Sequence, residues 1–226
     1  MNNVTDWESR LVLHDLQPND HDFFTPEHVA QFLRNHKTGI DNRGRQQLVH
    51  IIKSYNDPTI LDVACGTAVN YEVLRNMGVK CLYTGYDRTQ QLLDHAKSLY
   101  GENILLKRGH AQDLPYADRT FDVSILRHIL EHMSPENAYR AIEEAIRVSI
   151  QETILVFFLT PHNGPTHNIE RRPSNIEGHP EITHYWNTYS WLQLMQFLSK
   201  FGRKISREDV YTFGAAAPDC IVRLRV

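Results

Sequence analysis

ILDVACGTA, residues 60–68, combines a short apolar run with an acid and then a succession of small residues. Ala64, Gly66 and Ala68 leave room for the backbone to approach another molecule closely. A buried strand that ends in such a turn is typical of open α/β sheets, whose ligands bind beyond the carboxyl ends of the strands. The stretch could hold a nucleotide pyrophosphate or a nucleoside with a charged tail, or it could be only a tight strand-to-helix turn.

Strands and helices alternate on both sides of this stretch. The strands read as Val-, Ile- and Leu-rich runs, which is typical of strands whose two faces are both covered. Helical stretches separate them, and this order predicts a doubly wound, Rossmann-like α/β sheet with parallel strands. The five expected strands are residues 59–64, 80–86, 103–109, 121–127 and 153–160.

The end of the chain has a different pattern. Ser190 is expected to cap a helix that Gly202 ends. Two strand-like pieces follow, 209–214 and 219–226, and the link AAAP between them is too short for a crossover helix. They are therefore expected to form an antiparallel hairpin, which makes seven strands in all.

The domain organisation follows from these elements. Helices are expected from Pro26 to Gly39 and from Arg45 to Tyr55, and residues 1–56 are interpreted as a helical cap. Residues 57–226 would form the α/β domain. The polar segment 161–189 is long for a loop, and such loops are usually functional or disordered.

Composition narrows the functional classes. The chain of 226 residues is 41% hydrophobic and 23% charged, which is typical of a folded globular protein. Its formal net charge of −3 gives no field that attracts nucleic acid. The run Ile154–Leu159 is too short to cross a bilayer, and the first residues lack the features of a secretory signal. Three scattered cysteines fit a cytosolic protein without disulfides or structural zinc.

Acids follow three successive strands. Asp62, Asp87 and Asp113 would lie at one edge of the sheet, where Asp87 could accept both hydroxyls of a ribose and Asp113 an exocyclic amino group. A pyrophosphate site would favour G-x-G-x-x-G, but only Gly66 matches a glycine of that pattern. The acids therefore favour a nucleoside with a cationic tail, and a nicotinamide-dependent dehydrogenase is the alternative.

Three stretches together resemble the class I S-adenosylmethionine-dependent methyltransferases, most closely their small-molecule branch. They are ILDVACGTA, YTGYDRTQQLLDHAK (83–97) and GHAQDLPYADRTFDVSILRHILEHM (109–133). The family's first motif usually reads hhDhGCGTG, where h is apolar, so Ala64 and Ala68 replace common glycines. The resemblance covers roughly residues 59–160 and implies S-adenosylmethionine as the cofactor.

The resemblance also implies roles for single residues. The methionine end of the cofactor would lie near the first motif and the end of the fourth strand. The ribose would bind to Asp87, adenine to the Asp113 side chain and the Leu114 backbone, and the adenosine would be flanked by two further side chains. The implied cofactor-binding residues are Asp62, Ala64, Gly66, Asp87, Arg88, Gln112, Asp113, Leu114 and Arg127.

Methyl transfer to a hydroxyl needs a base beside the acceptor, and histidine has a suitable pKa. RHILEHM offers His128, Glu131 and His132 as catalytic candidates. Some sugar O-methyltransferases of the resembled family carry LHHM here, so Glu131 stands in place of a histidine. His132 could instead only pack near the cofactor.

The segment 161–189 and the N-terminal helices are expected to bind the acceptor. His184, Tyr185 and Trp186 are the candidate substrate contacts, and their mixture of aromatic and polar groups suits a polar small molecule or glycan such as a sugar. The other histidines of this segment are expected to be solvated, and no metal site is expected. Arg43 and Arg45 are interpreted as surface charges or, alternatively, as partners of the cofactor carboxylate.

Three other functions stay open at this point. They are the dehydrogenase, a catalytically silent binding module of the same fold, and a nucleic-acid methyltransferase. The last lacks support because SILRHILEHM stands where an N/D-P-P-Y/F/W motif would follow the fourth strand.

Overall fold

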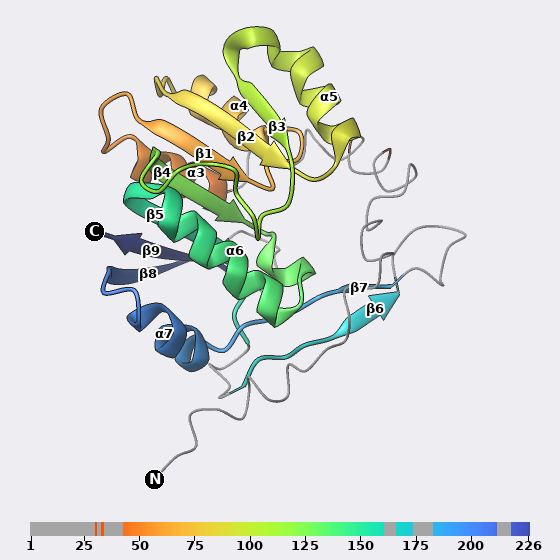
Figure 1. The fold of residues 1–226 in the computed structure, drawn as a ribbon, viewed down its shortest axis with the longest axis vertical. Coiled ribbons are helices and arrows are strands. Elements are labelled where there is room, and N and C mark those ends of the chain that lie inside the picture. The colour runs from red at the N-terminus through yellow and green to blue at the C-terminus, as the bar shows by residue number, and fades with distance from the viewer. Residues whose placement is uncertain (1–29, 31–32, 34–42, 161–165, 174–182, 212–217) are drawn as a thin grey trace.

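The computed structural model describes residues 30, 33, 43–160, 166–173, 183–211 and 218–226. Seven strands form one sheet in the order β3-β2-β1-β4-β5-β9-β8 (Figure 1). The first five in the chain are parallel, and β9 runs antiparallel between β5 and β8, so the predicted sheet is confirmed. The strands are β1 Thr59–Val63, β2 Leu82–Asp87, β3 Leu105–Arg108, β4 Phe121–Arg127, β5 Ser149–Phe157, β8 Lys204–Val210 and β9 Asp219–Arg225.

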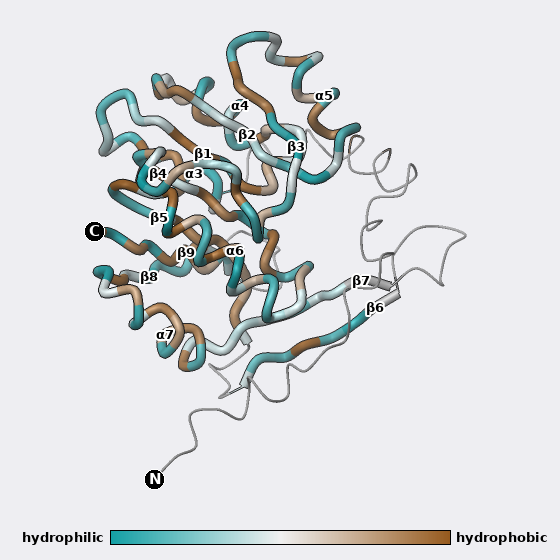
Figure 2. Tube along the Cα trace, in the orientation of Figure 1, coloured by the Kyte–Doolittle hydropathy of each residue, from teal (hydrophilic) through white to brown (hydrophobic). Residues whose placement is uncertain are grey.

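Helices cover both faces of this sheet. One core cluster combines α3 (Arg43–Ile52), α4 (Val69–Asn76) and α5 (Gln90–Tyr100) with Ile60 and its neighbours. The other combines α6 (Pro135–Val148) and α7 (Trp191–Ser199) with Leu61 and Val63, because successive residues of a strand face opposite sides. Figure 2 shows hydrophobic stretches along the central strands, as a sheet covered on both faces requires.

The first strand of the terminal hairpin lies earlier than predicted. It spans Lys204–Val210 rather than residues 209–214, of which 212–214 lie outside the described ranges. β8 is an edge strand with a neighbour on one side only, so its sequence KISREDV is polar and partly exposed. The prediction was wrong because it followed the more apolar residues next in the chain.

Part of the segment expected as a loop is a small sheet. β6 (Arg171–Pro173) pairs with β7 (Thr183–Tyr185) in an antiparallel hairpin that projects beyond the ends of the main strands (Figure 1). Isolated bridges join Leu159 to Tyr189 and Asn168 to Thr188. The segment is thereby attached to the end of β5 and to the start of α7.

Other predictions concern the helices. Ser190 caps α7 by accepting from the Gln193 N–H, as expected, and the expected helix 45–55 is found as α3. The helix expected from Pro26 to Gly39 lies outside the described residues except for Ala30 and Leu33, which are helical. No described helix has both the length and the apolar character that a membrane crossing demands.

His167 is not the solvated loop histidine that was expected. The Ser190 N–H donates to its Nδ1 at 2.7 Å, so its Nε2 carries the proton and donates to the Tyr139 hydroxyl, also at 2.7 Å. Burial lowers the pKa of His167 to about 4. The neutral ring therefore fastens the segment after β5 to α6 and α7, whereas His162 and His179 lie outside the described residues.

We expect acid to weaken the fold through His167. Its pKa is about 4 when folded and near 6.5 when unfolded, so the unfolded chain binds more protons between these values. The contribution is complete above pH 6.5 and is lost as the pH falls toward 4. Discounted for partial exposure, the free energy of unfolding should fall by about 2 kcal/mol in urea titrations across this range.

The variant His167→Asn checks this attribution. The asparagine side-chain oxygen can accept from the Ser190 N–H but does not titrate, so the variant's stability should vary less with pH. The control is His50→Asn on the exposed face of α3. A pH profile of His167→Asn that matches the unaltered protein would show that another group dominates.

Candidate active site

The turn after β1 has an unusual backbone. Ala64, Gly66 and Ala68 have φ values of 60°, 56° and 59°, in the left-handed region. The N–H groups of Ala64 and Cys65 both donate to the Tyr86 carbonyl, at 2.6 and 3.2 Å. This winds the turn against the end of β2, and two alanines tolerate a conformation that favours glycine. The turn therefore keeps bare backbone at the carboxyl edge of the sheet.

Close packing beneath the turn depends on Gly85 in β2. A Cβ atom there would lie 2.7 Å from the Cys65 sulfur and 2.8 Å from a methyl carbon of Leu106. Burial raises the pKa of the Cys65 thiol well above its ordinary value, so this cysteine is a small packed side chain.

Asp87 ends β2 directly beside this turn. Its carboxylate accepts from the Gly66 N–H at 2.9 Å and from the Thr89 N–H at 2.8 Å, so it joins the turn to the start of α5. The residue is only 8% exposed, and burial raises its pKa. The Thr89 side chain also bonds to this carboxylate, which has about four acceptor positions, so acceptor capacity remains for a further donor such as a ribose hydroxyl.

Asp62 is buried beneath the same edge at 1% exposure. Asn70 of α4 donates to both of its oxygens, at 3.2 and 3.0 Å, and the Tyr83 hydroxyl donates to one of them. Burial raises the pKa of Asp62 to about 6. With these partners the carboxylate holds α4 and β2 together below the turn.

Arg45 is not a surface charge. Its Nε donates to Asn70 Oδ1 at 2.8 Å, so α3 joins the network around Asp62. Burial, followed by the positive charge of Arg127, lowers the pKa of Arg45 to about 9. The interpretation as surface charge is wrong for Arg45 because α3 packs this side chain inward, whereas Arg43 is exposed.

The backbone of the loop after β3 is bound to α6. The Leu114 N–H donates to Glu144 at 2.8 Å, and its carbonyl accepts from Arg147 at 2.9 Å. The backbone of Leu114 therefore binds α6, and its contact with adenine stays a prediction. The Asp113 side chain is exposed in the same loop, and Gln112 is partly buried.

Charged groups gather where β4 ends. Arg127 donates to Asp219 at 3.1 Å, and His128 lies between Glu131 at 2.9 Å and the other oxygen of Asp219 at 3.1 Å. Burial alone would lower the pKa of His128, but hydrogen bonds to Asp219 and Glu131 outweigh it and the pKa is raised. Both ring nitrogens thus face carboxylates, which leaves His128 poorly suited to accept a proton from a substrate.

His132 lies in a different setting at the end of the 3-10 turn Leu130–His132. Its Nδ1 lies 3.3 Å from the Tyr185 carbonyl, and its ring meets the Trp186 ring edge to face with centroids 5.5 Å apart. A carbonyl only accepts, so Nδ1 carries the proton and Nε2 bears the lone pair. Burial lowers the pKa of His132, which keeps the ring neutral at pH 7.

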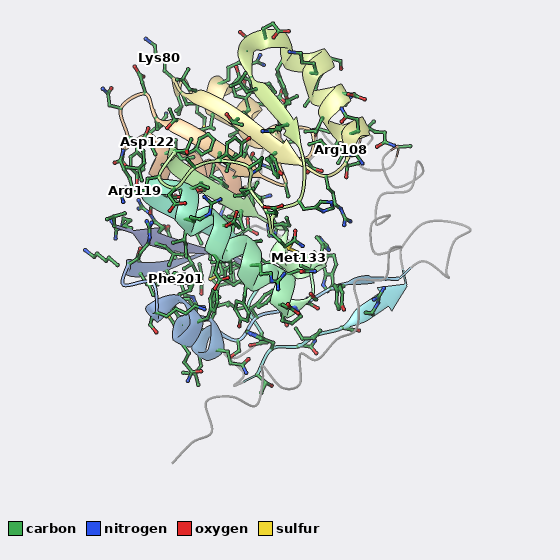
Figure 3. The ribbon with its side chains drawn as sticks, in the orientation of Figure 1. Lys80, Arg108, Arg119, Asp122, Met133 and Phe201 are labelled. Carbon is green, nitrogen blue, oxygen red and sulfur yellow. The ribbon has the colours of Figure 1, made fainter. Side chains whose placement is uncertain are left out.

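The structure therefore brings together most of the predicted site residues at one edge. The turn 64–68 and Asp87 follow β1 and β2, and His132, which contacts Tyr185 and Trp186, follows β4, the other neighbour of β1. Met133, the residue after His132, is labelled beside α6 and the β6–β7 hairpin in Figure 3. In the same figure Arg108 marks the end of β3. His184 pairs with Arg172 in that hairpin, and Arg88 is partly buried next to Asp87.

Sequence reasoning missed Asp219 and underestimated Arg45. Asp219 begins β9, and the pairing of Phe157 with Cys220 shows that an antiparallel β9 starts where β5 ends. Its position at the first residue of the last strand was the available signal. Within the described ranges no group of three or more His, Cys, Asp or Glu side chains is arranged to hold a metal ion.

Comparison with known proteins gives one family match. The model of a methyltransferase domain matches residues 61–157, from β1 to the end of β5. That span contains the turn 64–68, Asp87 and His132, but not Asp219 or the β6–β7 hairpin.

Curated relatives match part of the chain. A demethylmenaquinone methyltransferase of Lactobacillus johnsonii is 30% identical over 146 residues, which are 59% of this chain and 60% of that protein. One of Desulfitobacterium hafniense is 29% identical over 116 residues, 49% of this chain and 45% of the relative. The chain thus spans about half the length of these relatives.

A solved structure shares the fold. It is the 1,6-didemethyltoxoflavin-N1-methyltransferase of Burkholderia thailandensis, solved with 1,6-didemethyltoxoflavin and S-adenosylhomocysteine bound. The TM-score is 0.62 at 12% identity, over 88% of this chain and 87% of the other. At that identity the likeness concerns the fold alone.

Proposed function

Residues 61–157 belong to the methyltransferase domain family, and on that premise we propose that the protein transfers a methyl group from S-adenosylmethionine to a small polar molecule. The acceptor atom in this proposal is a hydroxyl oxygen, with a sugar hydroxyl as the first candidate. The observation that carries the proposal is the left-handed turn 64–68, which the buried Asp87 carboxylate binds at the ends of adjacent strands. Residues 57–226 would form the catalytic domain.

The residues at this edge fit the cofactor. Bare backbone at Ala64 and Gly66 suits close contact with the amino-acid end, and Asp87 has acceptor capacity left for a ribose hydroxyl. Arg45 and Arg127 bring positive charge toward the same edge, and Asp113 and Gln112 lie on the loop that would flank the adenosine. When bound, S-adenosylmethionine supplies a methyl group already activated on a sulfonium.

His132 is the proposed general base. Its Nε2 bears a lone pair, because Nδ1 donates to the Tyr185 carbonyl, and burial keeps the ring neutral. It can therefore take the proton of an acceptor hydroxyl as the oxygen attacks the methyl group. Trp186 and Tyr185 stand beside this histidine and would exclude water from the acceptor.

The proposed acceptor class is supported by the segment 161–189, of which residues 166–173 and 183–189 are described. Trp186 is 36% exposed, and Arg171 lies over the Tyr185 ring at 5.1 Å. Aromatic faces beside charged and polar groups suit a ring that carries hydroxyl groups, and a sugar is such a ring. The names of the curated relatives give a planar quinone-type ring as the competing acceptor class.

The first experiment is calorimetric titration of the full chain with S-adenosylmethionine, S-adenosylhomocysteine and NAD. We expect both sulfur nucleosides to bind and NAD not to bind. Binding of NAD alone would overturn the proposal in favour of a dehydrogenase. Binding of none of the three would overturn it in favour of the silent binding module.

The second step identifies the acceptor. Radiolabelled S-adenosylmethionine is incubated with a panel of free sugars, sugar nucleotides, and hydroxylated quinols and phenols. We expect label in a sugar fraction, at a base-resistant ether position. Label in the quinols alone, or at nitrogen or carbon, would overturn the sugar hydroxyl as acceptor while leaving the methyltransferase proposal in place.

A further inference from the structure

His128 occupies a strained position directly after β4. Its φ is 51°, in the left-handed region, and its N–H donates to the Val156 carbonyl at 2.8 Å. A histidine costs free energy in this conformation, so the surroundings must hold it there. The ring is tilted against the Phe158 ring with centroids 4.7 Å apart, which fixes one face.

Two carboxylates from different elements bind the edge of this ring. Nδ1 meets Glu131 Oε1 at 2.9 Å, and Nε2 meets Asp219 Oδ1 at 3.1 Å. An ionised carboxylate only accepts, and a neutral imidazole has one N–H donor. Both contacts are hydrogen bonds only when the ring carries two protons.

The burial of Glu131 points to the same charge state. The residue is 1% exposed, and its Oε2 has no hydrogen-bond partner among the described residues. A carboxylate buried in this way needs a cation beside it. Its Oε1 accepts from His128 Nδ1 and, at 3.0 Å, from the Phe158 N–H. The imidazolium of His128 is therefore the cation in direct contact with Glu131.

Other charged and titratable groups also lie near His128 and Asp219. Arg127 donates to the second oxygen of Asp219 at 3.1 Å, Arg45 of α3 lies within electrostatic reach of Asp219, and His132 follows in the same turn. Asp219 also packs against Gly44, where a Cβ atom would lie 1.8 Å from its Oδ2. β4, β9, β5 and α3 therefore meet around His128.

We propose that His128 is a positioning residue, an imidazolium held between Glu131 and Asp219 that fixes the turn of residues 128–132 and so orients His132. The proposal rests on the proposed function for the role of His132 as base. The turn is also bound to the acceptor segment, because the Asn187 N–H donates to the Glu131 carbonyl at 2.9 Å. A shift of Glu131 would therefore move His132 and the residues beside Trp186 together.

The cation has a second effect on His132. After burial, which lowers the pKa of His132 most, the positive charge of His128 lowers it further. The imidazolium thus helps to keep the neighbouring ring neutral and able to accept a proton. A neutral side chain at position 128 would remove this contribution.

The test is nuclear magnetic resonance of the full chain labelled with ¹⁵N at the histidine rings. We expect the His128 signals of an imidazolium at pH 7.5, with both nitrogens protonated, and those of a neutral His132 with its proton on Nδ1. A neutral His128 at this pH would overturn the proposal. This readout requires neither cofactor nor acceptor.

The variant His128→Asn separates positioning from general stability. Asparagine tolerates a positive φ but carries no charge, so we expect the pKa of His132 to rise and kcat to fall about tenfold. The dissociation constant of S-adenosylhomocysteine should stay within about twofold, since a positioning role concerns the turnover step. The control is His50→Asn, which removes an exposed histidine.

Different results would overturn the inference about His128 and the proposed function. A His128→Asn protein that melts earlier but keeps the pKa of His132 would mean a structural role and overturn the inference. A second variant, Asp219→Asn, should lower the pKa of His128 itself, and an unchanged value would also overturn it. Failure of the unaltered protein to bind sulfur nucleosides would instead count against the proposed function.

Discussion

Asp87→Ala is expected to raise the dissociation constant of S-adenosylhomocysteine about 100-fold, equivalent to about 3 kcal/mol. The change removes the buried carboxylate that is proposed to accept from the ribose. It also leaves the Gly66 and Thr89 N–H groups without the carboxylate that receives them at 2.9 and 2.8 Å. The turn 64–68 then loses its link to α5. Calorimetric titration measures the effect directly.

Two further variants serve as controls for this result. Asp87→Asn keeps one acceptor oxygen, so its affinity should fall between those of the unaltered protein and Asp87→Ala. Asp94→Ala removes an exposed acid of α5 that accepts from Gln90 at 2.8 Å, and this variant should bind normally. If Asp87→Ala and Asp87→Asn both fold and bind as tightly as the Asp94 control, the ribose does not bind at Asp87.

His132→Phe is expected to lower the rate of methyl transfer to a hydroxyl by about 10²- to 10⁴-fold, the usual contribution of a general base. Phenylalanine preserves a ring against Trp186 but has no lone pair at the Nε2 position. The affinity for S-adenosylhomocysteine should be unchanged. Rapid-quench measurement of a single turnover separates the chemical step from product release.

The pH profile gives an independent check. The base must be neutral, so the rate of the unaltered protein should fall as the pH drops through the pKa of His132, which burial places below its ordinary value. This acid limb should disappear in His132→Phe. The control His50→Phe should keep it, and a His132→Phe protein that retains a tenth of the activity would mean that the base lies elsewhere.

The sheet could be predicted from sequence because its central strands are buried on both faces. Apolar runs such as Ile60–Val63 and Ile154–Phe157 are compatible with few structures other than buried strands. The short link before Asp219 requires the strand that follows it to run antiparallel to the one before. The edge strand β8 could not be located in the same way. It has one neighbour and an exposed face, so its residues show no apolar pattern.

The candidate site was predictable where strand order alone creates it. Parallel strands end at one edge, so Asp62, Gly66 and Asp87 had to lie near one another. The direction in which a side chain points was not predictable. Arg45 stands near the start of a helix, and the sequence pattern there is the same whether its side chain faces water or the core. Nothing in the sequence indicated that Glu144 and Arg147 of α6 bind the backbone of Leu114.

The contact between Asp219 and His128 joins residues 91 positions apart. It requires β9 to be paired in the sheet between β5 and β8. Ligand affinity at the edge is thereby coupled to cooperative folding of the sheet, so a bound nucleoside stabilises strands that it never touches.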